Sequence, residues 1–445
     1  MENAKALPRK RFFIEMFTRD ISLNDCILDL IDNSIDGYFR QNETLFSEIY
    51  NEKMNSKGEK LPQIKIDFDE KSIKIFDTCG GISYDYAKEE VFNFGHEYNH
   101  YESGDSVRLG VYGIGLKRAI FKMGNYFKIA SSTLDSGFIT EIISLDEWSK
   151  KDDSLDDWMF PIQKYAKREG ATLIEVKDLR KETSGAIRDK LFEKFLYDDV
   201  ARVYTLFLER YVEIIINGKS VKPLPIMFSE SEDIVTATKE ITIDNVKIKL
   251  YAGLAERDEI NPWTAEKAGW YIACNGRIVV SANKDETTGW GVGALPLFHS
   301  KQRGFIGLVT FTSINPWLLP WTTTKRNLNK ESIVFQKTRV EMQTIARPII
   351  SFLDKMYQKE SQEENIDRKI VMNVTAVDIR SISNREDKKF EVKISTLQKK
   401  STTTIQFSVE KKDIDKIKKY LNDPRLSNGQ IGKITFDEYL KRVKI

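Results

Sequence analysis

The sequence predicts an α+β protein of two or three domains, and three observations lead to this prediction. The 445 residues exceed what a single hydrophobic core usually holds. From Ile27 to Gly37, apolar residues recur at intervals of three and four, which is typical of an amphipathic helix. From Gln63 to Asp77, apolar and polar residues alternate in two bursts, which predicts a β-hairpin.

Composition excludes several classes of protein. The chain is 41% hydrophobic and 31% charged, and no apolar run approaches the ~20 residues that span a bilayer. Because the first residues also lack a secretion signal, we expect a cytoplasmic protein without a membrane contact. The three cysteines are widely spaced and odd in number, which argues against a disulfide framework. Residues 369–445 hold 18 Lys and Arg against 10 Asp and Glu, a basic excess that permits a nucleic-acid partner without requiring one.

Two polar residues of the predicted helix lie on one face. Asp29 and Asn33 are four residues apart, so their side chains stand one turn above each other. A carboxylate and a carboxamide in this arrangement hold a water and a divalent cation against a phosphate. The alternative is a solvated acidic face without chemistry.

A second polar position ends the predicted hairpin. Asp77 is followed closely by Gly80 and Gly81, which let the backbone approach a flat ligand. A carboxylate beside such a turn is placed to accept a hydrogen bond from an exocyclic amine such as that of adenine. The alternative is a simple strand-to-helix turn with an aspartate cap.

A third stretch is rich in glycine. Gly110, Gly113 and Gly115 precede a predicted helix whose first turn carries Lys117. Free backbone N–H groups and the helix dipole there predict an anion site. The stretch is not a P-loop, because the order Gly-Lys-[Ser/Thr] is absent. It also does not follow a strand in a βαβ unit, which argues against a dinucleotide fingerprint.

Together the three stretches resemble the nucleotide-binding motifs of the GHKL superfamily, which includes gyrase, the large heat-shock chaperones, histidine kinases and MutL. The motifs are Asp29-x-x-x-Asn33, Asp77-x-x-x-Gly81 and Gly113-x-Gly115-Leu116-Lys117. The strings LIDNSID and YGIGLK are most similar to the MORC-like and chaperone-like branches. Thr172, in the predicted strand from Gly170 to Val176, matches the family's strand threonine near the adenine-binding aspartate.

The resemblance implies a Bergerat-type α/β sandwich that holds ATP and Mg²⁺ between helices and a mixed sheet. It implies that Asp29 activates water, that Asn33 ligates Mg²⁺ and that Asp77 binds adenine. The further nucleotide contacts that it implies are Gly81, Ile82, Gly110, Tyr112, Gly113, Ile114, Gly115, Leu116, Lys117 and Thr172.

Two positions depart from the family pattern. Asp29 stands where the family has glutamate, which draws the carboxylate back by ~1.5 Å. This predicts either slow cleavage or a differently placed water. Cys79 replaces the first glycine of the family's Asp-x-Gly-x-Gly turn, so we expect the chain to bend at Gly80 instead.

The rest of the chain predicts a strand-rich second block. Residues 184–211 have the pattern of one long helix, and VEIIING, VKIKLYAGL, GWYIACNGRIVV and RGFIGLVTF predict strands. This block resembles the transducer-like (S5-like) domain of the gyrase, MutL, chaperone and MORC branches. Lys325 matches the lysine that the family's transducer sends to the γ-phosphate, with a solvated basic turn as the alternative. The expected domains are 1–183 for ATP binding, 184–345 for the transducer-like block and 346–445 for a small α+β accessory region.

These patterns predict a slow, Mg-dependent ATPase whose nucleotide state drives domain closure or dimer clamping. The expected partners are a second copy when ATP is bound, and a nucleic acid or protein through the basic C-terminal region. The process is expected to be either a DNA transaction or defence against phage, and the sequence does not choose between them. The alternative function is a non-hydrolysing, ATP-regulated scaffold or a nucleic-acid-binding module. A histidine kinase is disfavoured, because that branch lacks the strand-rich second block.

Overall fold

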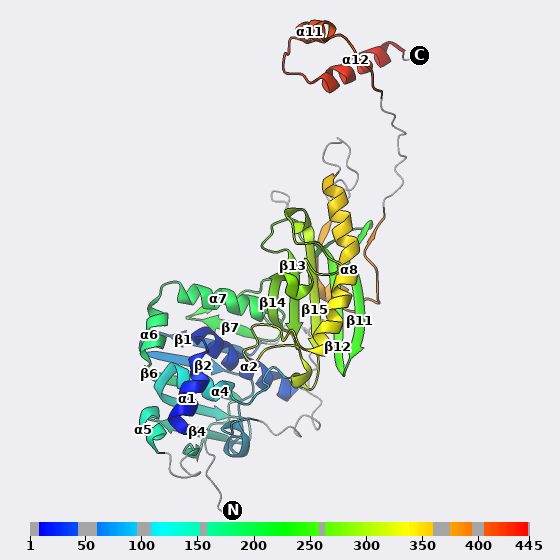
Figure 1. Ribbon diagram of the computed structural model, residues 1–445. Coiled ribbons are helices and arrows are strands. Elements are labelled where there is room, and N and C mark those ends of the chain that lie inside the picture. Colours follow the sequence, from blue (N-terminus) through cyan, green and yellow to red (C-terminus); the bar gives the residue numbers. More distant parts are fainter. Residues whose placement is uncertain are drawn as a thin grey trace, which may run out of the picture. The chain divides into compact units, whose positions relative to one another are not determined.

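The computed structural model describes residues 9–42, 60–95, 108–151, 158–257, 263–358, 374–393 and 405–443 (Figure 1). The chain divides into two compact units, Met1–Ile394 and Ser395–Ile445. The first unit contains two large sheets. The second contains two helices that contact each other, α11 (Lys411–Tyr420) and α12 (Asn428–Val443).

Within the described residues, the first sheet has eight strands in the order β5-β4-β3-β6-β2-β1-β7-β8. The strands are β1 (Gln63–Phe68), β2 (Ser72–Asp77), β3 (Gly124–Ser132), β4 (Gly137–Ile142), β5 (Ile162–Lys164), β6 (Ala171–Leu179), β7 (Glu213–Ile216) and β8 (Lys219–Ser220). Strands β1 and β2 form the predicted hairpin, while β7 runs parallel to β1. Because β2 ends at Asp77 and pairs with β6, Asp77 lies directly opposite Thr172.

Helices accompany this sheet, and their bounds are α1 (Lys10–Arg19), α2 (Leu23–Asn42), α3 (Tyr84–Tyr86), the π-helix η3 (Ala87–Val91), α4 (Gly115–Met123), α5 (Leu145–Lys150), α6 (Lys181–Arg188) and α7 (Phe192–Val203). The helix predicted at Ile27–Gly37 is confirmed as the middle of α2. Its apolar positions Ile27, Ile31 and Ile35 are fully buried. Helix α2 also packs against α4, which brings the first and third motifs together.

The prediction of one long helix over 184–211 is wrong. The chain leaves the helical path at Asp189, whose side chain accepts a hydrogen bond from Leu191 N at 2.9 Å. A local bond of this kind competes with helical backbone bonds and separates α6 from α7. Leu191 and Phe195, two of the apolar positions that suggested a continuous helix, are about half exposed.

The second sheet follows the order β14-β13-β15-β12-β9-β16, with β11 paired to β12. Its strands are β9 (Met227–Glu230), β11 (Ala237–Ile243), β12 (Val246–Ala255), β13 (Gly269–Cys274), β14 (Arg277–Asn283), β15 (Phe305–Thr312) and β16 (Thr375–Asp378), and a separate pair joins β10 (Ile234–Val235) to β17 (Glu391–Val392). Short helices are η6 (Glu286–Thr288), η7 (Ser300–Gly304), η8 (Pro316–Leu318) and α10 (Ile379–Ile382).

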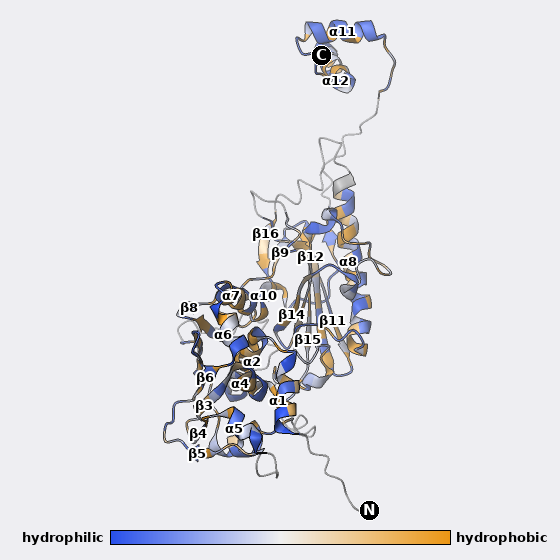
Figure 2. Cartoon of the chain, turned by 60° about the vertical axis from the view of Figure 1, so that its left-hand side comes forward, coloured by the Kyte–Doolittle hydropathy of each residue, from blue (hydrophilic) through white to orange (hydrophobic). Residues whose placement is uncertain are grey.

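Helix α8 (Ile333–Gln358) packs against β12 and β15. Hydrophobic and hydrophilic residues alternate along it (Figure 2), and its buried positions include Met342, Ile349 and Leu353. Amphipathic spacing of this kind places one helix face on the sheet.

The expected domain limits stay predictions, but three features cross them. The first sheet continues past residue 183 to β8, α8 spans residue 345, and β16 of the expected accessory region joins the second sheet. Among the described helices, none combines the length and the apolar character that crossing a membrane requires.

Candidate active site

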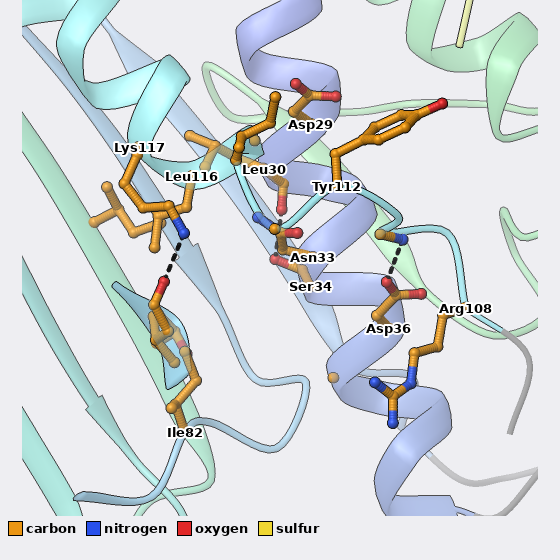
Figure 3. Close-up of a pocket in the computed structure, with 18 of the residues that line it drawn as sticks. Asp29, Leu30, Asn33, Ser34, Asp36, Ile82, Arg108, Tyr112, Leu116 and Lys117 are labelled. Atoms are coloured by element: carbon orange, nitrogen blue, oxygen red, sulfur yellow. Dashed lines mark hydrogen bonds between the residues drawn. The ribbon is translucent and has the colours of Figure 1, made fainter. Parts of the chain in front are cut away.

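One pocket gathers every site residue that the sequence predicted. It lies between helix α2, the glycine-bearing segment before α4, the ends of strands β2 and β6, and the segment after β15 (Figure 3). The predicted residues that line it are Asp29, Asn33, Asp77, Gly81, Ile82, Gly110, Tyr112, Gly113, Ile114, Gly115, Leu116, Lys117, Thr172 and Lys325. Segments separated by nearly 300 residues therefore meet at one cavity, while the role of each residue stays a prediction.

Helix α2 supplies a polar stripe to the pocket. Asp29, Asn33 and Asp36 follow the spacing i, i+4, i+7, so they share a face (Figure 3). The Asn33 side chain is exposed and has no hydrogen-bond partner among the described residues. Asp36 accepts hydrogen bonds from Leu109 N at 2.7 Å and Gly110 N at 2.6 Å, which fix the start of the glycine segment. Burial raises the pKa of Asp36 to about 6, although these two bonds lower it.

Asp29, the expected water-activating residue, is buried in an ion pair. Its Oδ2 accepts a hydrogen bond from Arg118 Nη2 at 2.6 Å, and its Oδ1 lies 4.0 Å from Lys325 Nζ. Gly115 permits this approach of α4 to α2, because a Cβ there would meet Asp29 Cβ at 3.3 Å. One of the two oxygens that would accept a proton from water is thus occupied by a guanidinium.

Lys325 reaches the pocket from the segment after η8 and ends on Asp32, one residue before Asn33. Lys325 Nζ donates to Asp32 Oδ2 at 2.7 Å, and Tyr204 Oη donates to Asp32 Oδ1 at 2.7 Å. Arg277 Nε lies 3.1 Å from Asp32 Oδ1, and Arg277 Nη1 donates to the Lys325 carbonyl at 2.7 Å. Burial alone would raise the pKa of Asp32, but Arg277 and Lys325 outweigh it and lower that pKa.

This chain of ion pairs has more cations than carboxylates. Arg118, Arg277 and Lys325 face Asp29 and Asp32, and all five side chains are buried. Buried charges need partners, because a low-dielectric interior solvates them poorly. Arg118 Nε also lacks a hydrogen-bond partner in the described part of the chain. A phosphate oxyanion is a group that would satisfy this surplus.

The opposite end of the pocket centres on Asp77. Cys79 N donates to Asp77 Oδ1 at 2.9 Å, and Ser34 Oγ donates to Asp77 Oδ2 at 2.8 Å. Burial raises the pKa of Asp77 to about 6, while the bonds from Cys79 and Ser34 lower it. Thr172, opposite in the sheet, shares a 2.8 Å hydrogen bond with Ser131 Oγ. An acceptor and a hydroxyl side by side suit the edge of a purine base.

The turn after Asp77 bends as expected despite Cys79. Gly80 and Gly81 adopt φ values of 106° and 69°, a region that favours glycine. A Cβ on Gly81 would lie 2.0 Å from the Ser132 carbonyl oxygen, so this position admits no larger residue without backbone movement. Next along the chain, Ile82 N donates to Ser131 Oγ at 2.9 Å.

The glycine segment leads into α4 as predicted. Gly113 has a φ of 61°, and no side chain of the described residues caps the first turn of α4, whose N-terminus lines the pocket with backbone donors. Lys117, a predicted phosphate contact, has backbone partners of its own. Its ammonium donates to the carbonyls of Val91 at 2.8 Å and Asn93 at 2.6 Å, and burial lowers its pKa to about 7. A phosphate contact by Lys117 therefore needs these bonds to be shared or released.

The donor set of the pocket fits Mg²⁺ only if phosphate completes it. No group of three or more His, Cys, Asp or Glu residues gathers to hold a metal in the described part of the chain. Among the described residues that line the pocket, only Asn33 offers a carboxamide oxygen, and it lies at the centre of the polar stripe. Mg²⁺ typically takes one or two protein ligands together with substrate phosphates and water, so one amide oxygen is compatible with it.

Residues 21–185 match the family model described as "Histidine kinase-, DNA gyrase B-, and HSP90-like ATPase". The match begins just before α2, ends within α6 and includes all three motifs. This part of the chain is therefore a GHKL-type ATPase domain, a class that binds and hydrolyses ATP with Mg²⁺. No curated protein matches the chain.

Sequence reasoning missed several residues of the pocket wall. Asp36 could have been found, because it continues the spacing of Asp29 and Asn33 by three residues. Ser34 of α2 was also missed, although its hydroxyl donates a hydrogen bond to Asp77 Oδ2. Arg118 and Arg277 gave no signal, since nothing in their local sequence indicates a buried carboxylate partner 89 and 245 positions away.

Proposed function

We propose that this chain is a slow, Mg-dependent ATPase in which the second sheet senses the nucleotide through Lys325. One observation carries the proposal. Lys325, from the end of the strand-rich block, enters the pocket lined by the three motifs of the ATPase domain and pairs with Asp32 on α2. A cation from the segment that follows β15 and that lines the pocket of the ATPase domain can make the arrangement of the two sheets depend on the ligand.

Different residues of the pocket bind different parts of the nucleotide. Asp77 accepts a hydrogen bond from the adenine amine, with Thr172 beside it. The N-terminus of α4 and the segment from Gly110 to Gly115 cradle the phosphates, since backbone donors and the helix dipole favour anions. Asn33 would hold the cation through its amide oxygen, and bound Mg²⁺ would supply neutralisation of the phosphate charge.

Asp29 orients or deprotonates the attacking water. It is one turn from Asn33 on the same face of α2, at the end of the pocket where α4 begins. Arg118 holds one of its oxygens, which leaves the other for water. The short side chain and the ion pair both favour slow turnover.

The nucleotide state drives closure of the ATPase domain on the second sheet, with clamping of a second copy as the dimeric form of the same movement. The surplus cation near Asp32 and Asp29 supports this, because the γ-phosphate gives Lys325 a partner that ADP lacks. A role in DNA transactions or phage defence, and a nucleic-acid or protein partner of the basic C-terminal region, stay predictions.

A non-hydrolysing, ATP-regulated scaffold is the second candidate. The 2.6 Å contact between Arg118 and Asp29 favours it, because the guanidinium occupies a carboxylate oxygen that a water would otherwise contact. The two candidate functions predict different rates of ATP hydrolysis but the same ATP binding.

The test compares ATP turnover and calorimetric ATP affinity in the parent, Asp29→Asn and the control Asp20→Asn, whose carboxylate is exposed. Asp29→Asn keeps the side-chain size and is expected to lower turnover by ~10²–10⁴-fold while ATP still binds. The control should match the parent. Parent-like hydrolysis by Asp29→Asn would mean that another group activates the water. A parent that binds ATP but never hydrolyses it would establish the scaffold.

A further inference from the structure

We propose that the Asn275–Gly276 turn between β13 and β14 clamps the nucleotide pocket, with Asn275 positioning the glycine segment and Arg277 positioning helix α2. This turn belongs to the second sheet, yet its side chains touch two walls of the pocket of the ATPase domain. The identity of the ligand in this inference rests on the proposed function. The way in which the pocket walls are held does not depend on it.

The turn has a shape that aims its side chains toward the ATPase domain. Asn275 and Gly276 have φ values of 47° and 82°, and Cys274 pairs with Arg277 across them, which is a two-residue hairpin turn with both central residues left-handed. Asn275 is completely buried, so its carboxamide must find partners.

Asn275 holds the glycine segment from outside. Its Nδ2 donates to the Arg108 carbonyl at 2.8 Å and to the Ser313 carbonyl at 3.1 Å, while Ser313 N donates to its Oδ1 at 3.0 Å. Ser313 follows β15 and thereby fixes the carboxamide to the second sheet. The next two residues after Arg108 donate their N–H groups to Asp36 of α2. The segment is thus held between a carboxamide of the second sheet and a carboxylate of α2.

Arg277 holds the other wall. It is buried, lies 3.1 Å from Asp32 Oδ1 and donates to the Lys325 carbonyl at 2.7 Å. A third contact reinforces the arrangement, because the Tyr112 ring of the glycine segment meets the Trp317 ring edge-on at 4.9 Å. Two neighbouring positions of one turn therefore set the separation of α2 and the glycine segment, between which the phosphates are proposed to bind.

A clamp of this kind couples two events. Ordering of the glycine segment by a nucleotide strengthens its docking on Asn275, and loss of Asn275 weakens nucleotide binding by the same factor. The path differs from that of Lys325, because it runs through the segment that contacts the phosphates and does not require a γ-phosphate.

The experiment measures amide hydrogen exchange of the full chain without nucleotide in the parent, Asn275→Gly and Asn275→Asp. Glycine removes the carboxamide but accepts the left-handed backbone. Aspartate also tolerates this conformation and keeps the acceptor for Ser313 N–H, but it lacks the donor to Arg108. In both variants, exchange at Leu109 and Gly110 is expected to rise roughly 2- to 12-fold, the effect of losing one hydrogen bond.

The β7–β8 hairpin provides a matched control. Asn217 and Gly218 form the same kind of turn, with φ values of 44° and 77°, but Asn217 binds Phe68 N and Glu193, away from the pocket. Asn217→Gly is expected to leave exchange at Leu109 and Gly110 unchanged. The clamp proposal would be wrong if both Asn275 variants showed the parent's exchange rates at Leu109 and Gly110. It would also be wrong if Asn217→Gly raised exchange at these residues by as much as the Asn275 variants do.

A second arm adds ATP with Mg²⁺. In the parent, the nucleotide is expected to slow exchange across residues 271–279, and Asn275→Gly is expected to lose this protection and to bind ATP roughly 2- to 12-fold more weakly. A parent that binds ATP without protecting the hairpin would refute the coupling. A parent that binds no ATP would refute the proposed function instead, and the first arm would still decide whether Asn275 positions the segment.

Discussion

Lys325 Nζ lies 2.7 Å from Asp32 Oδ2, although the two residues are 293 positions apart. The contact joins the segment between β15 and α8 to the helix that carries Asp29 and Asn33. The two sheets are therefore linked by a buried ion pair. The γ-phosphate of the proposed function would compete with Asp32 for the Lys325 ammonium.

Lys325→Met removes this cation and keeps an apolar side chain of similar length. We expect ATP affinity to fall and ADP affinity to stay near the parent value, because only ATP offers a γ-phosphate. Loss of one charged hydrogen bond should also lower the free energy of unfolding by about 1.5–3 kcal/mol, since Asp32 keeps Arg277 and Tyr204. Calorimetry and urea denaturation measure these effects, with the exposed Lys301→Met as control. If the variant bound ATP and ADP as tightly as the parent does, Lys325 would have no role in nucleotide sensing.

Asp77→Asn turns an acceptor oxygen into a donor that faces the expected adenine amine. ATP binding should weaken by about 1–3 kcal/mol, the cost of an unsatisfied buried pair, and GTP binding should change less. Titrations with both nucleotides measure the difference. Asp67→Asn, an exposed change on the neighbouring strand β1, is the control. If neither affinity moves, the base lies elsewhere in the pocket.

Asn33→Ala deletes the carboxamide that has no protein partner among the described residues. We expect ATP affinity in the presence of Mg²⁺ to fall to the value measured in EDTA, because no other protein ligand for the cation is assigned. The metal-free affinity serves as the internal reference. A variant whose ATP affinity still rises with Mg²⁺ would show that the cation is held without Asn33.

Asp36 is expected to make stability depend on pH. Burial raises its pKa to about 6 from the ordinary 3.8, so between these values the folded chain binds more protons than the unfolded chain. The free energy of unfolding therefore falls as pH rises through this window. From pH 5 to pH 7, the free energy of unfolding of the parent should fall by roughly 1 kcal/mol relative to that of Asp36→Asn, in which residue 36 cannot titrate. Urea denaturation at the two pH values measures this, and a pH-independent difference would contradict it.

The site could be predicted from sequence wherever local spacing carries the chemistry. Asp29 and Asn33 share a face because of the helical repeat, Asp77 ends a strand whose alternation is visible, and glycines mark the turn before α4. Lys325 was found through resemblance alone. The partners of Asp32 could not be found, because nothing local in Arg277 or Tyr204 reveals which distant carboxylate they meet. The same limit explains the long helix predicted over 184–211, where the side chain of Asp189 overrides a plausible apolar repeat.

The parallel pairing of β7 with β1 affects where the molecule can be cut. A fragment that ends at residue 185, the limit of the family match, keeps β1 but lacks β7. The backbone groups from Gln63 to Ile66 that β7 covers would then form an open sheet edge, with the apolar Ile64 and Ile66 beside it. Open edges of this kind invite pairing between molecules. We therefore expect that a fragment made for soluble expression must extend at least to Ser220, beyond the residues that carry the ATPase motifs.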